Sequence, residues 1–299
     1  MTLRQLEYFV GTAELGTFSA AAQRLHVSQT AVSLALADLE RALGVQLFLR
    51  RRPHASVLTA PGRELLVRAR RVLAEANEFE CEAVSAGADV AGTIVVGSFP
   101  TVTPHLMGRV LERLPERYPG LRVELVEDSV QGLQQRLREG MCDVAIMYDI
   151  GIESGISTTP LYSCSPHIVL RADHPLAGES AVEIAQIIRE PMILVDMPPS
   201  AEYFFGVLHR AGYTPNVRYR AGAIETIRSL VGRGMGWSML LHTPATQVSY
   251  DGGLVVHLPV RNLDEHVDVL LAQPDAGHPT ARMRAFIDHC RRTLSSLSG

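Results

Sequence analysis

Polar side chains near position 30 have the chemistry and spacing to contact DNA bases. Gln29, Thr30 and Ser33 follow Ser28 at the start of a segment with helical periodicity. The buried face of this helix is predicted to consist of Val32, Leu36, Leu39 and Leu43. Gln pairs bidentately with adenine, and Ser and Thr hydroxyls bond base edges or phosphates. Because the start of a helix also favours a nearby phosphate, this polar face predicts contact with double-stranded DNA.

Leu34 lies beside these polar residues but is apolar. Two interpretations are open for it: contact with a thymine methyl group, or packing inside its own domain. The segment has no basic residue before Arg41. The positive charge that attracts DNA must therefore come from elsewhere in the chain.

The run Arg50-Arg51-Arg52 supplies such charge, and Arg24 offers a further cation. Alone, an arginine run is more often a solvated surface patch. Beside a base-reading helix it predicts contact with phosphates or the minor groove. Residues 1–72 hold ten Arg against five acidic residues, although the net charge of the whole chain is −4. A basic head on an acidic body indicates that the head meets a polyanion.

Three short helices are expected to position these groups. The first starts near Leu3 and stops at Gly16. The second, SAAAQRL, is expected to be capped by Ser19, and Ser28 is expected to cap the third, which ends before Gly44. The short turn between the second and third helices is typical of a helix-turn-helix.

A wing and a long helix are expected next. Two short strands around residues 53–56 predict the wing, and Thr59 is expected to cap a helix that reaches about Ala86. The apolar residues of this helix recur at spacings of four and three, as in a coiled-coil seam: Leu65, Ala69, Val72, Ala76, Phe79 and Ala83. Packing onto its own domain is one interpretation. Pairing with a second copy is favoured, since no neighbouring segment in the head offers a matching apolar face.

From Ala91 onward, strands alternate with helices, which predicts an α/β body with mainly parallel sheets. Pro and Gly interruptions near 149–161 and 259–265 suggest that the chain leaves one lobe and returns to it. Two lobes joined in this way place a cleft between them, where small ligands commonly bind. The predicted domains are a winged helix-turn-helix at 1–60, a linker helix at 61–88, and a two-lobed body at 89–299, with lobe I at about 91–160 and 266–299 and lobe II at about 161–265.

Three loops are candidates for contacting a ligand in that cleft. They contain Ser98, Phe99, Pro100 and Thr101 after the first strand, Ser129 after the second, and Pro198, Pro199 and Ser200 after PMILVD. Backbone amides and hydroxyls at helix starts suit an anionic or polar ligand. Simple helix capping is the alternative for each Ser or Thr.

The composition excludes several kinds of site. All 28 basic residues are Arg, which excludes lysine-based catalysis and a phosphate-loop lysine. The cysteines form no CxxC pair and indicate reduced thiols: Cys81, Cys142, Cys164 and Cys290. The glycine-rich stretch at 232–236 follows a helix instead of a strand, so it is interpreted as a turn. No catalytic residue, metal site, cofactor or membrane span is predicted, and a cytoplasmic location is expected.

Several stretches together resemble the LysR-type transcriptional regulators. They are Leu3–Phe9, Thr17–Ala22, Val27–Ser33, Leu43–Val45 and Leu58–Gly62 in the head, and His174–Ala177 and Gly232–Gly236 in the body. The resemblance covers essentially the whole chain. This sequence departs from the family at Leu34, where Arg or Lys is frequent, and at Thr59-Ala60-Pro61-Gly62, where Thr-x-Ala-Gly is more usual.

The resemblance implies a sequence-specific DNA-binding transcription regulator, an activator or a repressor, whose periplasmic-binding-protein-like body senses a small-molecule effector. It also implies that the loops at 98–101 and 198–200 face each other across the cleft. Homodimers formed through the linker helix and tetramers are expected, and RNA polymerase is left open as a further partner. Two alternatives are kept: an effector-independent DNA-binding protein, and a bifunctional protein with an enzymatic body. The absence of Lys and of catalytic motifs counts against the second.

Overall fold

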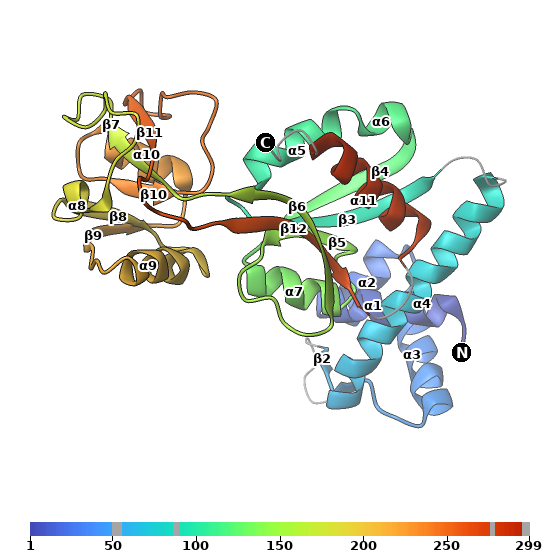
Figure 1. Cartoon of the computed structure of the whole chain (residues 1–299). Coiled ribbons are helices and arrows are strands. Elements are labelled where there is room, and N and C mark those ends of the chain that lie inside the picture. Colours follow the sequence, from blue (N-terminus) through green and yellow to red (C-terminus); the bar gives the residue numbers. More distant parts are fainter. Residues whose placement is uncertain (50–55, 86–89, 276–278, 295–299) are drawn as a thin grey trace.

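The computed structural model describes residues 1–49, 56–85, 90–275 and 279–294, and in the long helix it describes the backbone alone at 78 and at 80–85. Three parts are distinct in Figure 1: a helical head, a lobe I beside it, and a lobe II at the far end of the molecule. The chain passes from the head into lobe I through the long helix α4 (Ala60–Ser85).

The head is a winged helix-turn-helix. Its elements are α1 (Leu3–Leu15), α2 (Phe18–Arg24), α3 (Gln29–Leu43), β1 (Phe48–Leu49) and β2 (Val57–Leu58). The two short strands pair antiparallel, as expected for a wing. Ser28 caps α3 as predicted, and Gly44 ends it with a φ of 70°, a left-handed conformation that glycine adopts without steric cost.

The cap predicted for the second helix is wrong. Thr17, not Ser19, caps α2, and its hydroxyl accepts a hydrogen bond from the backbone N–H of Ala20 at 3.0 Å. Both residues are good capping types. Thr17 takes the role because its backbone is extended just before the helix, whereas Ser19 already lies inside the first turn.

The long helix α4 begins as predicted after Thr59, whose hydroxyl accepts a hydrogen bond from the backbone N–H of Gly62 at 2.9 Å. Its first turns pack onto the head, since Ala69 is buried in the same core as Phe9 of α1. This differs from the expectation that the head has no apolar face for this helix. The contact holds the start of α4 against α1.

Lobe I is built around a five-stranded sheet with the order β4-β3-β5-β12-β6. Its strands are β3 (Ala91–Ser98), β4 (Gly120–Glu127), β5 (Val144–Tyr148), β6 (Ile156–Cys164) and β12 (Val267–Pro274). Its helices are α5 (Thr103–Glu112), α6 (Leu114–Arg117), α7 (Val130–Arg138) and α11 (Ala281–Leu294). Figure 1 shows α5 and α11 on one face of the sheet and α7 on the other.

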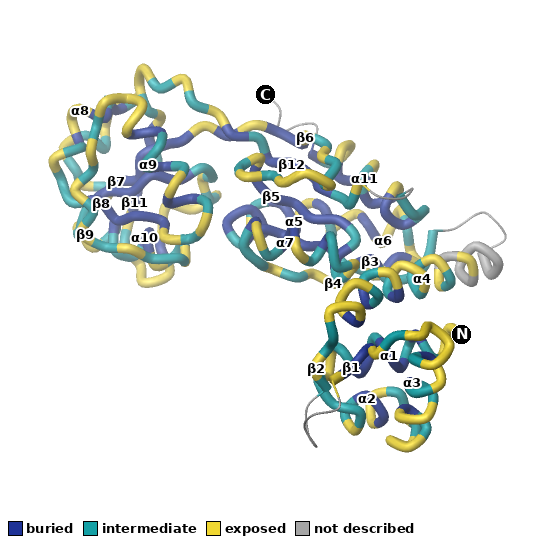
Figure 2. Tube along the Cα trace, turned by 90° about the horizontal axis from the view of Figure 1, so that it is seen from below, coloured by how far each residue is buried: buried dark blue, intermediate teal, exposed yellow. Residues whose placement is uncertain are grey.

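Lobe II has a second core of its own, which is centred on buried strands in Figure 2. Its strands are β7 (His167–Arg171), β8 (Pro191–Val195), β9 (Asn216–Ala221), β10 (Ser238–Leu240) and β11 (Val255–Pro259). Its helices are α8 (Ile184–Ile187), α9 (Ser200–Arg210) and α10 (Ile224–Gly232). The strands form a β10-β7-β11 sheet and a β8-β9 pair. The glycine-rich stretch at 232–236 lies in the turn between α10 and β10, as predicted.

The prediction of mainly parallel sheets is wrong for about half of the pairings. In lobe I, β3 pairs in parallel with β4 and β5, but β12 pairs antiparallel with β5 and β6. The reason is that β12 returns from lobe II and enters the sheet in the opposite direction. In lobe II, β7 pairs antiparallel with both of its neighbours.

The first crossing between the lobes lies later than expected. Residues 149–161 include the start of β6, which stays in lobe I up to Cys164, so the crossing itself consists of Ser165 and Pro166. The return runs through residues 260–266, close to the predicted position. Within the described parts of the chain, no helix is long and apolar enough to cross a membrane.

Candidate DNA-reading face and ligand pocket

The start of α3 presents a polar face to solvent. Gln29, Thr30 and Ser33 are exposed, while the opposite face of the helix is buried in the head. Leu34 is 63% exposed. It is therefore not part of the head's core, and of its two interpretations the structure supports the one in which it faces outward. A contact with a thymine methyl group is sterically open to it.

Ser28 is positioned differently from its neighbours. Its hydroxyl accepts a hydrogen bond from the backbone N–H of Ala31 at 3.1 Å, so it acts as the cap of α3. The proposed arginine contacts at Arg50, Arg51 and Arg52 lie outside the described residues. Arg24 is described, and it forms an ion pair with Glu14 at 2.9 Å.

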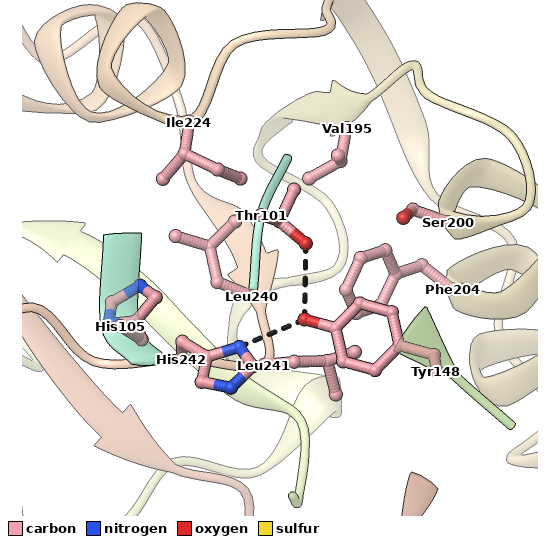
Figure 3. Close-up of a pocket in the computed structure, with 10 residues that line it drawn as sticks. All are labelled: Thr101, His105, Tyr148, Val195, Ser200, Phe204, Ile224, Leu240, Leu241 and His242. Atoms are coloured by element: carbon pink, nitrogen blue, oxygen red, sulfur yellow. Dashed lines mark hydrogen bonds between the residues drawn. The ribbon is translucent and has the colours of Figure 1, made fainter. Parts of the chain in front are cut away.

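A pocket lies between the two lobes, at the carboxyl ends of parallel strands from each (Figure 3). Its volume is about 300 Å³, part of which is open to solvent. Lobe I contributes the residues Thr101, His105 and Tyr148, and lobe II contributes Val195, Ser200, Phe204, Ile224, Leu240, Leu241 and His242. Ligands of α/β proteins commonly bind at this edge of the sheet.

One hydrogen-bond network spans the pocket. The Tyr148 hydroxyl lies 3.1 Å from the hydroxyl of Thr101 and 2.9 Å from Nδ1 of His242 (Figure 3). The hydroxyl of Tyr162, on β6, lies 2.8 Å from Nε2 of the same imidazole. Both ring nitrogens of His242 are thus engaged with tyrosine hydroxyls of lobe I.

The histidines of the pocket are neutral at physiological pH. Burial, and to a smaller extent the neighbouring His105 and His167, lower the pKa of His242 to about 3. His105 stacks on His242 with ring centroids 4.7 Å apart. Its pKa is also lowered, first by burial and then by the charges of Arg228 and Arg109. The pocket lining therefore offers hydrogen bonds and apolar surface but no full charge.

The structure brings together two of the residues predicted for the cleft. Thr101 and Ser200 line the pocket from opposite lobes, and both are at least nine-tenths buried. Ser98 and Phe99 lie behind the lining: Thr103 donates a hydrogen bond to the Ser98 hydroxyl at 2.8 Å, and the ring of Phe99 packs edge-on against that of Tyr148.

The other predicted cleft residues are not among the pocket's lining. The hydroxyl of Ser129 accepts a hydrogen bond from the backbone N–H of Gly132 at 3.1 Å and so caps α7. Pro100 follows Phe99, and Pro198 and Pro199 precede α9, joined by a cis peptide bond. The capping alternative fits Ser129 best.

Several lining residues were missed by sequence reasoning. Tyr148 ends β5, so the rule that selected Ser98 at the end of β3 would also have selected it. His105 lies in the first turn of α5, and its place in the sequence carries no comparable signal. Leu241 and His242 follow β10 in a loop without a recognisable motif. These two residues line the pocket only because of how lobe II packs against lobe I, and local sequence patterns do not indicate that packing.

The predicted seam of α4 divides into two parts. Leu65 and Ala69 pack onto the head of the same chain. Val72 and Phe79 are 42% and 74% exposed, and Ala76 between them is partly exposed. Only the second part is therefore available for pairing with another copy.

The described residues do not form a recognisable metal site. Among the residues that the structure describes, no group of three or more His, Cys, Asp or Glu side chains could hold a metal ion. The described cysteines Cys142, Cys164 and Cys290 are free and buried.

These features define the class of protein. A winged helix-turn-helix with an exposed polar face on its third helix is joined by a long helix to a two-lobed body with a pocket between the lobes. This is the architecture of a DNA-binding transcription regulator that responds to a small molecule.

Comparison with known proteins gives the family. The family model described as a bacterial regulatory helix-turn-helix protein of the lysR family matches residues 3–63, and that of the LysR substrate binding domain matches residues 87–295. The chain belongs to the LysR family of transcription regulators. Such regulators bind promoter DNA and small-molecule effectors and form oligomers.

Individual relatives agree with this assignment. The chain is 32% identical over 299 residues to the uncharacterized HTH-type transcriptional regulator YvbU of Bacillus subtilis, covering 99% of this chain and all of that protein. It is 33% identical over 241 residues to a probable hydrogen peroxide-inducible genes activator of Mycobacterium avium, covering 80% of this chain and 77% of the relative. The crystal structure of HinK, a LysR family regulator from Pseudomonas aeruginosa, matches with a TM-score of 0.68 and 34% identity, covering 99% of each chain.

Proposed function

We propose that the pocket between the lobes is the effector site of this regulator. The observation that carries the proposal is the placement of two hydroxyl-bearing residues. Ser200 of lobe II and Thr101 of lobe I are both more than nine-tenths buried and line the pocket from opposite lobes. A ligand that forms a hydrogen bond with either hydroxyl gains binding free energy from it. Because Thr101 lies on the other lobe, a ligand bonding both would fix the lobes relative to each other.

The lining indicates the chemical class of the effector. The helix α9 has no side-chain cap, so backbone N–H groups in its first turn lack an intrahelical partner. At the start of α5, by contrast, the N–H groups of Thr103 and His105 are already bonded to the carbonyls of Phe99 and Val102. The start of α9 therefore favours an acceptor group such as a carboxylate or a carbonyl. Val195, Phe204 and Ile224 supply apolar surface beside it. We therefore propose a small organic molecule with one acceptor group and a short apolar body.

Reversible binding fits this pocket better than turnover. A general base needs a free ring nitrogen near the substrate, but both nitrogens of His242 are engaged by tyrosine hydroxyls. The described residues of the lining include no carboxylate, and the second imidazole, that of His105, is stacked on the His242 ring. We therefore propose that the body senses its effector and does not convert it.

Sensing by a thiol is not supported for the described cysteines, although some relatives are named for their response to hydrogen peroxide. Only the thiolate reacts readily with peroxide. Burial raises the pKa of Cys142, Cys164 and Cys290 to about 12 in each case. Cys164 lies beside the pocket, with its Sγ 3.5 Å from Nε2 of His242.

In the head, we propose that α3 enters the major groove and reads bases with Gln29, Thr30, Ser33 and Leu34, with Ser28 at the phosphate-facing helix start. The exposure of these side chains on one face supports the proposal. Gln can bond adenine and leucine can contact a thymine methyl group. The arginines at 50–52 would supply affinity for the backbone.

The effector proposal is tested with Ser200→Ala and Thr101→Val, which remove the two hydroxyls with little change in shape. Thermal unfolding of the full-length protein is followed with matched sets of small molecules, each set holding a carboxylic acid, its amide and the parent hydrocarbon. The wild type is expected to be stabilised by an acid or an amide of at least one set. Each variant should reduce that stabilisation by the equivalent of about 1–3 kcal/mol of binding free energy.

Ser129→Ala is the matched control, because it removes a hydroxyl that caps α7 outside the pocket. Its ligand response should equal that of the wild type. The proposal fails if the hydrocarbon alone stabilises as well as the acid and the amide. It also fails if Ser200→Ala and Ser129→Ala respond identically to the active ligand.

A further inference from the structure

A buried arginine on α4 contacts both the DNA-binding head and lobe I. Only 9% of the Arg70 side chain is exposed. Its Nη1 donates a hydrogen bond to the backbone carbonyl of Glu139 in lobe I at 3.1 Å, and its Nη2 lies 3.6 Å from the carboxylate of Glu14 in the head. One side chain therefore joins three parts of the chain.

The head side of this contact is shared with a second arginine. Glu14 lies near the end of α1, and its other carboxylate oxygen pairs with Arg24 of α2 at 2.9 Å. Arg24 lies in the first helix of the helix-turn-helix. If Arg70 moved closer to Glu14 or away from it, the strength of the Glu14–Arg24 ion pair would change. The position of α2, which carries Arg24, would change with it.

The lobe I side of the contact is the end of a helix that begins near the cleft. Glu139 is the residue at the carboxyl end of α7, and its carbonyl belongs to the negative end of the helix dipole. The cap of α7, Ser129, lies two residues after the end of β4, at the sheet edge where β3 and β5 also end and where the pocket lies. The helix packs along β5 between these two ends. A rigid helix thus connects the pocket edge of the sheet to Arg70.

The guanidinium of Arg70 does not use all of its hydrogen-bond donors toward the part of the chain that the structure describes, so a second set of contacts is open to it. Among the described residues, Nε of Arg70 is buried without a hydrogen-bond partner, and a separation of 3.6 Å from Glu14 is too long for a hydrogen bond. The same side chain lines a groove of about 810 Å³ between α4 and lobe I, open in part to solvent. Gly140 lies against the Arg70 side chain. Its φ of 65° is a left-handed backbone conformation in which any residue with a side chain would be strained.

We propose that Arg70 is a positioning residue that couples lobe I to the DNA-binding head through its alternative contacts with the α7 terminus and Glu14. When lobe I lies as in this structure, the Glu139 carbonyl holds one end of the guanidinium. When lobe I moves away, Arg70 closes onto Glu14 and competes with Arg24. The position of lobe I thereby affects the helix-turn-helix of the same chain through the Glu14–Arg24 ion pair.

Coupling between two sites is reciprocal, so the proposal can be tested without knowing the effector. Hydrogen exchange is measured on the full-length protein with and without a DNA duplex that carries the region upstream of its gene. DNA binding to the head is expected to change the exchange of amides at 136–143, which surround the end of α7. Arg70→Met should abolish this DNA-induced change, while the same change persists in Arg71→Met.

Arg71 is the matched control, since it is an exposed arginine on the same helix that lines the same groove. A second variant, Glu14→Gln, removes the carboxylate charge that faces both Arg70 and Arg24 and keeps Arg70, so it covers the case in which Arg70→Met does not fold. It should also abolish the DNA-induced change. The double variant should behave like either single variant.

Two results would overturn the proposal. One is an Arg70→Met or Glu14→Gln protein that folds, binds the duplex and shows the wild-type change at 136–143. The other is a wild-type protein in which DNA binding leaves the exchange at 136–143 unaltered. Loss of the change in Arg71→Met as well would assign the effect to the general charge of α4 and would overturn it too.

Discussion

The hydroxyl of Tyr148 lies 2.9 Å from Nδ1 of His242, and this hydrogen bond ties the sheet of lobe I to lobe II. Tyr148 is buried and His242 is partly buried, and burial raises the pKa of the tyrosine. The network around them is neutral and closed, so it holds the lobes together without any salt bridge in the pocket lining. An effector that enters between the lobes either breaks hydrogen bonds of this network or adds new ones to it.

Tyr148→Phe should destabilise the protein by about 1–3 kcal/mol, because it leaves Nδ1 of His242 buried and unpaired. Urea unfolding measures the change. Tyr250→Phe is the control, since the side chain of Tyr250 is 90% exposed and its hydroxyl should contribute nothing measurable. Equal unfolding midpoints for the two variants would contradict the role assigned to Tyr148.

Stability should fall as the pH is lowered from about 7 to about 5. In the folded protein the pKa of His242 and of His167 is about 3 and that of His257 about 4, against an ordinary value of 6.5. Burial causes all three shifts. Between these values the unfolded chain binds protons that the folded chain does not. The stabilising contribution is therefore complete above about pH 6.5 and is lost progressively toward the folded-state values.

Each of these histidines should contribute at most about 1.4 kcal/mol per pH unit to the slope. Urea unfolding at a series of pH values gives that slope. His167→Asn removes one titrating group while keeping a side chain that can bond His257, so its slope should be shallower than that of the wild type. A free energy of unfolding that is constant across this pH range would rule out neutral buried histidines.

Leu34→Arg should raise the affinity for any DNA duplex and steepen its salt dependence by about 0.9 in log–log slope for each phosphate contacted. The reason is that Leu34 is exposed on the face of α3 that presents Gln29 and Ser33. Fluorescence anisotropy with specific and random duplexes at several salt concentrations measures both effects.

The stability of the Leu34→Arg protein should change by less than about 0.5 kcal/mol, as for other exposed positions. A substantial loss of stability would mean that the side chain is covered, for example by another copy. A Leu34→Ala protein serves as the companion variant. It should lose discrimination at one base pair without gaining general affinity.

Phe79→Glu should weaken self-association. The Phe79 side chain is 74% exposed in the single chain, and burying such a side chain in a dimer stabilises each copy by about 1.5–3 kcal/mol. Light scattering coupled to size exclusion measures the mass. Val248→Glu, at an exposed valine of lobe II, should leave the mass unchanged. A wild-type mass for both variants would argue against pairing through this part of α4.

Much of the fold could be predicted from sequence because its signals are local. Ser28, Gly44 and Thr59 mark helix ends by their own backbone and hydroxyl chemistry, and the structure confirms each of them. The direction of β12 could not be predicted in this way. It depends on the chain's return from lobe II, which strand periodicity does not record.

The site was predictable only at its edges. Thr101 and Ser200 follow strands and open helices, which is a pattern visible in sequence. His242 reaches the pocket because two tyrosines from another lobe engage its ring. That relation joins residues far apart in the chain, and nothing in the residues next to His242 indicates it. Likewise, the burial of Ala69 against α1 can be recognised only once the packing of α4 on α1 is known.

The two crossings between the lobes differ greatly in length, Ser165 and Pro166 on one side and residues 260–266 on the other. The short crossing is stiffened by proline, and Tyr162 with its bond to His242 lies close to it. We therefore expect any turn of lobe II about this crossing to change the separation of the lobes least near Tyr162 and most at the far end of the pocket mouth.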